Sequence, residues 1–320
     1  MTQPLTHEDA PGRLGGYRPG SGLWVKLVRN DLLLRLRWRA EAQVSRVTLW
    51  LSWGARAVLY RVRPESGLAN RPRQSCFLCT TWRTGSTFLG DAVLAAVDLD
   101  LSREPFYLSH QQASLGAVLR GRSLLLYLDR VVVARGTNQH GIFGTKTMWT
   151  HFQEVLRCLR AIPEYRSLGE FEVLRSVFPE PVFLFLTRRD KLRQAISFYR
   201  AQTSQVWHRD DSGRLYTTPG PARVDPEYDY VRIRAARETI RKEEEGWRDF
   251  FHRNGIQPLE MSYEETCENL PAVRGRILER LGHRVQDERL GGARSKYVKL
   301  ADPKTEEWVE RFRSDSGKAM

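Results

Sequence analysis

One segment of this 320-residue chain reads Ser75-Cys-Phe-Leu-Cys-Thr-Thr-Trp-Arg-Thr-Gly-Ser-Thr87. It begins with an apolar run typical of a buried strand and ends in a turn rich in Gly, Ser and Thr. The pattern Thr87-Phe-Leu-Gly-Asp-Ala-Val-Leu-Ala-Ala-Val97 that follows predicts a helix. The turn therefore leads from a strand into a helix N-terminus, where backbone N–H groups and hydroxyls can bind an anionic group such as a phosphate.

This turn is not a Walker A loop. The pattern GxxxxGK[ST] is absent, and the cation of the turn, Arg83, precedes Gly85. A strand expected at 181–187 is followed by Arg188 and Arg189 and not by a carboxylate that could bind magnesium. Taken alone, the segment also fits an ordinary connection between a strand and a helix.

Further apolar strands alternate with helical patterns along the chain. A strand at 141–148 precedes a helix at 150–161, and the strand at 181–187 precedes a helix at 189–204. Short apolar strands alternating with amphipathic helices predict an α/β fold with a central parallel sheet covered on both faces. Further helices are expected at 231–254, 268–282 and 304–313, with a short strand at 256–261 and a long polar loop, functional or mobile, at 208–230.

The composition is that of a globular protein with a basic N-terminal part. The chain has 41% hydrophobic and 28% charged residues, and it lacks a run of about 18 apolar residues that could span a membrane. Its 51 basic and 38 acidic residues give a net charge of +13, and residues 1–74 hold 13 of the basic and five of the acidic ones. Such an excess indicates contact with an anionic partner or simply a solvated surface.

The distribution of residue types predicts three segments. Residues 1–21, rich in Pro and Gly, are expected to be a disordered tail, and 22–74 to be a basic, helical extension and linker rich in Trp, Leu and Arg. Residues 75–320 form the α/β domain. The apolar face expected within 22–62 suits an anionic membrane surface, the chain's own domain or the partner in a homodimer. Nucleic acid is not an expected partner.

Cys76 and Cys79 form a CxxC pattern, which elsewhere binds zinc or carries redox chemistry. Within a strand, however, their odd separation points the two thiols to opposite faces, which favours core cysteines. Four cysteines are too few to crosslink a chain of this size, and the first residues lack the pattern of a signal peptide. We therefore expect a cytoplasmic protein, with peripheral attachment to a membrane as an option.

A second candidate anion site lies in Arg188-Arg-Asp-Lys-Leu-Arg-Gln-Ala-Ile-Ser-Phe-Tyr-Arg-Ala201. Arg188 leaves the carboxyl end of a strand, where open α/β sheets bind ligands, and Ser197 follows on the expected helix. A guanidinium and a hydroxyl suit a second phosphate, such as one attached to a ribose. The alternative is a basic helix that merely faces solvent.

Together the two segments resemble a PAPS-dependent sulfotransferase. The blocks that narrow the resemblance to the bacterial trehalose 2-sulfotransferase family are Gly141-Ile-Phe-Gly-Thr-Lys-Thr-Met-Trp149, Gln194-Ala-Ile-Ser-Phe-Tyr-Arg-Ala201, Glu244-Glu-Gly-Trp-Arg248 and Trp308-Val-Glu-Arg-Phe312. They follow the family's order within about residues 75–314. The resemblance implies a three-layer, P-loop-like sulfotransferase fold and transfer of a sulfuryl group from PAPS, without a metal, to a hydroxyl of a carbohydrate, glycolipid or other small-molecule acceptor.

Residue by residue, the resemblance implies two groups of contacts with PAPS. The phosphosulfate would contact Arg83, Thr84, Gly85, Ser86 and Thr87. The 3′-phosphate would contact Arg188 and Ser197, and Lys146 would face the same cleft. Arg83, Lys146 and the loop amides would stabilise charge during transfer. A further family block corresponds to Tyr297-Val-Lys-Leu-Ala-Asp-Pro-Lys304. Leu300 stands where the family has Gln, so the resemblance assigns only Lys299 of this block to the binding of PAPS.

The acceptor side departs from the family. Glu104-Pro-Phe-Tyr107 keeps the first acid of a family segment, but Tyr107 stands where the family's proposed general base is an acid. A Tyr with a pKa near 10 is a poor base at neutral pH. Glu104 is therefore the expected base, with His110 as the alternative. A metal-dependent kinase and a non-catalytic protein that binds membranes or nucleic acid are the competing functions.

Overall fold

The computed structural model describes residues 72–108, 113–114, 121–217, 226–282, 297–298 and 302–318. The chain divides into two units, residues 1–58 and 59–320, and all the described residues belong to the second. The predictions for the tail at 1–21 and the contacts of 22–62 lie outside the described residues, as do His110 and Lys299. No helix within the described ranges is long and apolar enough to cross a bilayer.

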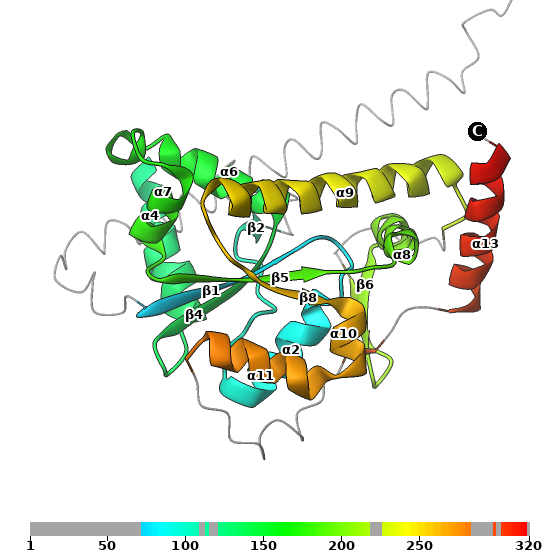
Figure 1. Ribbon diagram of the computed structural model, residues 1–320, viewed down its shortest axis with the longest axis horizontal. Helices are drawn as coiled ribbons and strands as arrows, with labels where there is room; N and C mark the ends of the chain where they lie inside the picture. Colours follow the sequence, from blue (N-terminus) through cyan, green and yellow to red (C-terminus); the bar gives the residue numbers. More distant parts are fainter. Residues whose placement is uncertain are drawn as a thin grey trace, which may run out of the picture. The chain divides into compact units, whose positions relative to one another are not determined.

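The centre of the unit is a parallel sheet in the order β4-β1-β5-β8 (Figure 1). Its strands are β1 (Gln74–Thr80), β4 (Ile142–Met148), β5 (Pro181–Thr187) and β8 (Leu259–Ser262). All three strand pairs are parallel. Each strand was predicted within a few residues, because a strand buried on both faces is a short and continuous apolar run. The predicted α/β fold is confirmed.

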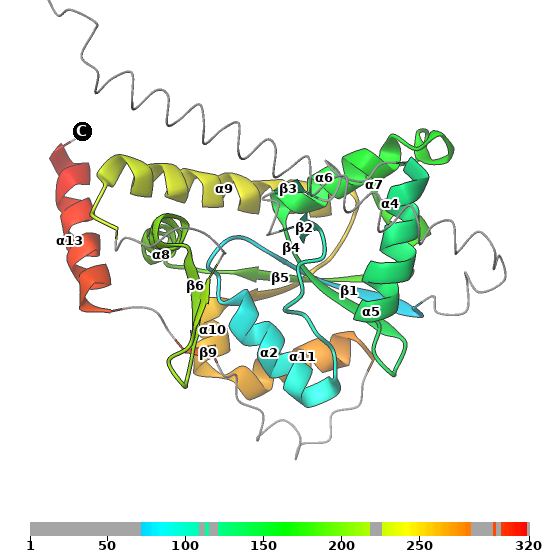
Figure 2. The same cartoon turned by 180° about the vertical axis from the view of Figure 1, so that it is seen from behind.

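Alternate residues of β1 enter two different hydrophobic clusters. Phe77 and Cys79 pack with residues of α6 (Trp149–Arg160), α7 (Glu170–Val177) and α9 (Tyr230–Arg253). On the opposite face, Cys76 and Leu78 pack with α2 (Ser86–Val97) and α11 (Leu270–Arg280). Figures 1 and 2 show these two helical layers on either side of the sheet. The sheet thus lies between helices, and the two thiols of the CxxC pattern face apart, as predicted.

The predicted loop at 208–230 is wrong at its start. A hairpin of β6 (Val206–Asp210) and β7 (Leu215–Thr217) occupies residues 206–217, and β9 (Tyr297–Val298) pairs with the other side of β6. Asp210 accepts hydrogen bonds from the side chains of Ser212 and Tyr216, which hold the hairpin closed. The many polar residues concealed the strands, because on this hairpin burial is only partial.

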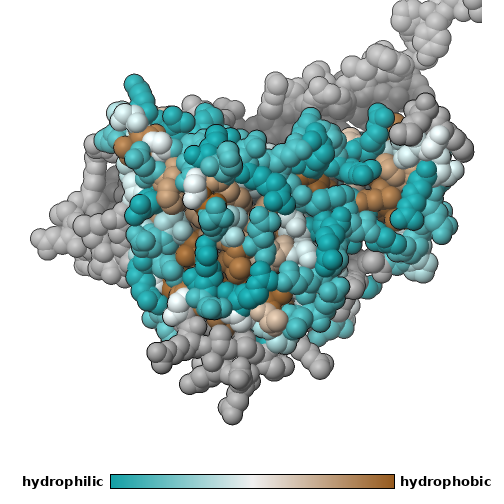
Figure 3. Space-filling model, viewed as in Figure 1, coloured by the Kyte–Doolittle hydropathy of each residue, from teal (hydrophilic) through white to brown (hydrophobic). Residues whose placement is uncertain are grey.

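The C-terminal helix α13 (Pro303–Lys318) packs against α8 (Lys191–Ser204). Arg200 on α8 forms an ion pair of 2.6 Å with Asp302, and Arg193 pairs with Glu306. Hydrophilic residues cover most of the face shown in Figure 3. The other elements are β2 (Tyr107–Leu108), β3 (Ala113–Ser114), α4 (Gly121–Tyr127), a π-helical segment (Leu128–Val133), α5 (Ala134–Gly136), a 3-10 helix (Pro163–Tyr165) and α10 (Tyr263–Glu268).

Candidate active site

The turn between β1 and α2 has a backbone shaped for an anion. Arg83 and Gly85 both have positive φ angles, 62° and 81°, so the chain turns sharply before the helix begins. Gly85 is the N-cap of α2, no side chain caps the helix, and its first turn holds no acidic residue. The N–H groups at this helix end therefore lack the partners that a capping side chain would supply, and the helix dipole favours a negative charge there.

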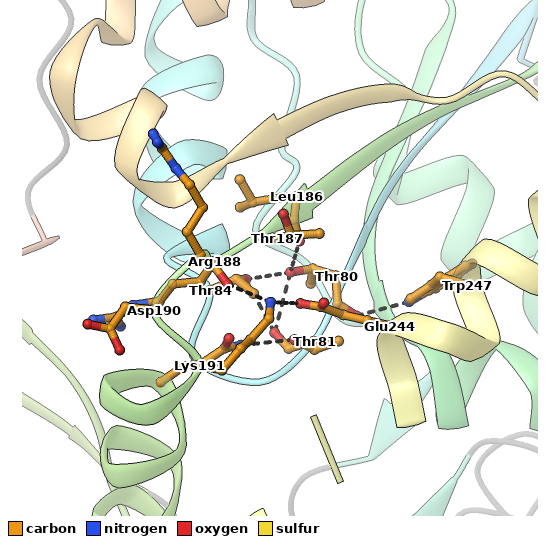
Figure 4. A network of polar contacts seen from close by, with 12 residues as sticks. Thr80, Thr81, Thr84, Leu186, Thr187, Arg188, Asp190, Lys191, Glu244 and Trp247 are labelled. Carbon is orange, nitrogen blue, oxygen red and sulfur yellow. Dashed lines mark hydrogen bonds and ion pairs between the residues drawn. The ribbon is translucent and has the colours of Figure 1, made fainter. Parts of the chain in front are cut away.

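A network of polar contacts holds the base of this turn (Figure 4). The hydroxyls of Thr80 and Thr84 contact each other, and Nε1 of Trp247 on α9 donates to the carbonyl of Thr80 at 3.0 Å. Lys191 on α8 donates to the carbonyl of Arg188 and to the carboxylate of Glu244 on α9. The Glu244-to-Trp247 block thus supports the loop from α9.

Two guanidinium groups meet beside the turn. Nε of Arg83 donates to Oγ of Ser197 at 3.0 Å, and Nη1 of Arg83 donates to the carbonyl of Trp207. Nη1 of Arg188 donates to the carbonyl of Arg83 at 3.4 Å, while its buried Nε has no hydrogen-bond partner among the described residues. Burial and the neighbouring Arg188 lower the pKa of Arg83 to about 10. Within the described ranges neither arginine forms an ion pair with a carboxylate, so this part of the site favours an anion.

Lys146 forms a second cationic group at the other side of the turn. Its Nζ lies 2.7 Å from Oε1 of Glu104, and its side chain is 3% exposed. Nζ also donates to Oγ1 of Thr87 at 3.1 Å. Nε2 of His208, on β6, lies 3.3 Å from the same hydroxyl. Burial, together with the charges of Arg83 and Lys146, lowers the pKa of His208 to about 3, so His208 is neutral at pH 7.

Tyr263 is a site residue that sequence reasoning missed. It follows the carboxyl end of β8, and its ring lies where a Cβ on Gly85 would be. The guanidinium of Arg188 lies 4.7 Å from the centre of that ring. The available signal was an aromatic residue directly after a strand of an α/β sheet, at the edge where such sheets bind ligands.

The structure brings most of the predicted site residues together. Thr84, Gly85, Ser86 and Thr87 form the turn and the start of α2, and the other five meet at its sides: Arg83, Glu104, Lys146, Arg188 and Ser197. The structure describes the backbone of Tyr107, in β2, but not its side chain. Trp207 and His208 were missed because only the hairpin brings them to the loop.

A model of the family described as Stf0 sulphotransferase matches residues 75–315. The chain belongs to the Stf0 sulphotransferase family. It is a sulfotransferase of the PAPS-dependent class, which confirms the family expected from the sequence. The trehalose 2-sulfotransferase of Mycolicibacterium smegmatis is 29% identical over 258 residues, 73% of this chain and 92% of that protein. The trehalose 2-sulfotransferase of Mycobacterium tuberculosis is 31% identical over 187 residues, 57% of this chain and 64% of that protein.

A solved structure of retinol dehydratase, in complex with androsterone and the inactive cofactor PAP, is a more distant match. It has 14% sequence identity and a TM-score of 0.31, with 78% of this chain and 82% of that chain covered. The assignment of the present chain to the α/β class rests on the sheet order β4-β1-β5-β8 and on the family match.

Proposed function

We propose that the protein transfers the sulfuryl group of PAPS to a hydroxyl of a carbohydrate, glycolipid or other small-molecule acceptor. Membership of the family supports the reaction class. The observation that carries the proposal is the pairing of an uncapped helix N-terminus with two arginines that lack carboxylate partners within the described ranges. Such an arrangement suits a ligand with two separate anionic groups, as PAPS has.

The first anionic group, the 5′-phosphosulfate, fits the turn that precedes α2. We assign its contacts to the backbone and side chains of Thr84, Gly85, Ser86 and Thr87. Positive φ angles at Arg83 and Gly85 turn the backbone before the helix, and the N-terminus of α2 is free of a competing carboxylate in its first turn. The N–H groups of this turn would supply neutral donors, which bind an anion without requiring a metal ion.

The second anionic group, the 3′-phosphate, fits beside Arg188 and Ser197. The buried Nε of Arg188, unpartnered in the described part of the chain, is a donor that such a phosphate would satisfy. Arg83, expected on the phosphosulfate, donates to Ser197 in this structure. We assign Arg83 to the space between the two anions, where one guanidinium can serve both. Tyr263 would line the nucleotide site next to it.

When bound, PAPS supplies an activated sulfuryl group. We assign Lys146 to the negative charge that develops as that group is transferred, because its ammonium already touches the loop at Thr87. Glu104 was expected as the general base, and this stays a prediction. The carboxylate of Glu104 forms an ion pair with the ammonium of Lys146, so in the absence of the donor Glu104 neutralises that charge.

Calorimetry with adenosine 3′,5′-bisphosphate (PAP) and with 5′-AMP, in the absence of magnesium, tests donor binding. We expect PAP to bind at least about 30-fold more tightly, since a guanidinium–phosphate contact contributes roughly 2 kcal/mol or more. Incubation with PAPS and pools of hydroxyl acceptors, with mass detection of released PAP and sulfated product, tests transfer. Equal affinity for both nucleotides would contradict the proposal, and an absolute requirement for magnesium would favour a kinase.

A further inference from the structure

The β6–β7 hairpin reaches the loop between β1 and α2, residues 81–85, and the first turn of α2, through two consecutive residues; we call this segment the donor loop, after its proposed ligand. The carbonyl of Trp207 accepts a hydrogen bond from Arg83, and Nε2 of His208 lies 3.3 Å from Oγ1 of Thr87. The hairpin therefore contacts both cationic sides of the loop, although the resemblance to the family assigned no role to it. An imidazole at this position adds a proton-accepting group to the predicted site.

The hydrogen bonds around Thr87 are compatible with Nε2 of His208 as a hydrogen-bond acceptor. The ammonium of Lys146 can only donate, so Oγ1 of Thr87 accepts its hydrogen bond at 3.1 Å. The hydroxyl hydrogen of Thr87 is then available to donate to Nε2 of His208. In the neutral tautomer that accepts this hydrogen bond, the proton is on Nδ1 and the lone pair of Nε2 faces the loop. His208 thus presents a proton acceptor to the place assigned to the sulfuryl group.

We propose that His208 accepts the proton of the acceptor hydroxyl, which makes it a catalytic residue of the transfer. The inference rests on the function proposed above. A bond forms between the acceptor oxygen and sulfur while the bond from sulfur to the 5′-phosphate oxygen breaks, and the electron pair of the broken bond leaves with that phosphate oxygen. The proton of the hydroxyl moves to Nε2 of His208 and is later lost to water. The products are a sulfate ester and PAP.

Glu104 is less suited to this role in the arrangement seen here. Its Oε1 lies 2.7 Å from the ammonium of Lys146, which is almost fully buried. A substrate proton can reach this oxygen only by displacing the ammonium, which would leave a buried charge without its partner. At the loop, Nε2 of His208 meets the hydroxyl of Thr87, and a substrate hydroxyl could take the place of that hydroxyl as the donor to this nitrogen.

The charges that face His208 couple its basicity to the donor. Arg83 faces it from the loop after β1 and Lys146 from β4, with Glu104 beyond Lys146, and Tyr216 pairs with it across the hairpin. Burial and the two cations hold the pKa of His208 near 3. The anionic groups of a bound nucleotide would offset both cations and raise this pKa toward its ordinary value. His208 would therefore become a stronger base when the donor is present.

Nuclear magnetic resonance on the full chain tests this coupling without turnover. The imidazole signals of His208, assigned by their loss in His208→Gln, would be titrated with and without saturating PAP. We expect protonation at or below about pH 4 in the free protein and an upward shift of at least about one pH unit with PAP, which is a tenfold change in proton affinity. An unchanged titration on saturation with PAP would overturn the proposal.

Kinetics of the same variant tests the catalytic role. Loss of a general base typically lowers the rate by about 10²–10⁴-fold, so His208→Gln should lose at least about 100-fold in kcat while its Kd for PAP stays within about threefold. The fall of kcat toward acid pH should disappear in the variant, and added imidazole should partly restore His208→Ala. His252→Gln, which changes an exposed histidine of α9, is the matched control and should match the wild type.

The outcomes separate this inference from the function on which it rests. If the wild type fails to bind PAP, the proposed function fails and the role of His208 falls with it. If the wild type turns over and His208→Gln keeps more than about a third of its kcat, well above the loss expected for a base, only the role of His208 is wrong. Loss of the acid limb in Glu104→Gln, with that limb kept in His208→Gln, would return the role to Glu104.

Discussion

Nε of Arg83 donates a hydrogen bond of 3.0 Å to Oγ of Ser197, and this contact joins the loop after β1 to helix α8. The two residues were expected to serve different anionic groups of the donor. Their direct contact places the two proposed anion sites next to each other, with the guanidinium of Arg83 between them. A ligand that carries both anions would therefore compete for a hydrogen bond that the protein makes to itself.

The first prediction concerns the 3′-phosphate. Arg188→Ala should weaken PAP binding by about 2–4 kcal/mol and Ser197→Ala by roughly 1 kcal/mol, because an ionic hydrogen bond contributes more than a neutral one. Calorimetry should show that Arg188→Ala binds PAP hardly better than 5′-AMP. Arg248→Ala, at an exposed position of α9, is the control and should leave both affinities unchanged. A normal preference for PAP in Arg188→Ala would remove this residue from the site.

The second prediction concerns Gly85. Its φ angle of 81° disfavours any other residue, and an added Cβ would overlap the ring of Tyr263. Gly85→Ala should thus displace Tyr263 and weaken PAP binding at least about tenfold, or roughly 1.4 kcal/mol. Gly255 has a φ angle of 61° with nothing near its missing Cβ, so Gly255→Ala shares the backbone strain without the overlap. That control should lose about 1–2 kcal/mol of stability and keep its affinity. Equal affinities in the two variants would refute the role of Tyr263.

The third prediction separates two roles of Glu104. Glu104→Gln removes the negative charge beside Lys146 and leaves an ammonium free to attract the donor. We expect PAP to bind about threefold to tenfold more tightly, as measured by calorimetry, which corresponds to roughly 0.6–1.4 kcal/mol. An unchanged affinity combined with a loss of kcat of about 100-fold or more would instead support Glu104 as the base predicted from the sequence.

The fourth prediction uses Glu243, a carboxyl of α9 that is 3% exposed. Oε1 accepts a hydrogen bond from Oγ1 of Thr150 at 3.1 Å, and burial, only partly offset by hydrogen bonds with Thr150 and Trp82, raises the pKa from its usual 4.5 to about 7. Between these values the folded protein holds a proton that the unfolded chain releases. Stability should therefore fall as pH rises from about 4.5 to 7, by up to about 3 kcal/mol.

Denaturant unfolding at pH 5 and pH 8 measures this effect. Glu243→Gln cannot ionise, so it should lack this loss and be more stable than the wild type at pH 8, relative to pH 5. Glu245→Gln changes an exposed acid of the same helix and is the control. Parallel pH dependence in the wild type and Glu243→Gln would show that the carboxyl ionises freely in the folded protein.

The main strands and the donor loop could be predicted because their sequences carry local signals. A few consecutive residues are enough to predict each of these elements: the apolar runs of β1 and β5, and the Gly/Ser/Thr turn before α2. Arg188 and Ser197 were placed correctly on a strand end and a helix, because that reasoning needs only the order of elements.

The remaining site residues depend on contacts between distant segments. His208 and Trp207 lie on a polar hairpin in which apolar and polar residues alternate too weakly to predict strands. The contact between Thr87 and His208 joins two distant segments, and neither segment alone indicates it. Glu104 and Lys146 were both singled out, but their ion pair follows from the packing of the segment after α2 beside β4. Glu243 was missed because an acid on a charged helix normally faces solvent.

The position of β1 inside the sheet has a consequence for biosynthesis. It is the first of the four strands to be made, and its partners begin only at Ile142 and Pro181. At about 5–20 residues per second, a ribosome needs on the order of 5–20 s to add the roughly hundred residues before β5 appears. Part of the way through that interval β4 becomes available to pair with one edge of β1, but the other edge stays open until β5 is made. The loop at the end of β1 has to wait longer still for Ser197 of α8, which follows β5.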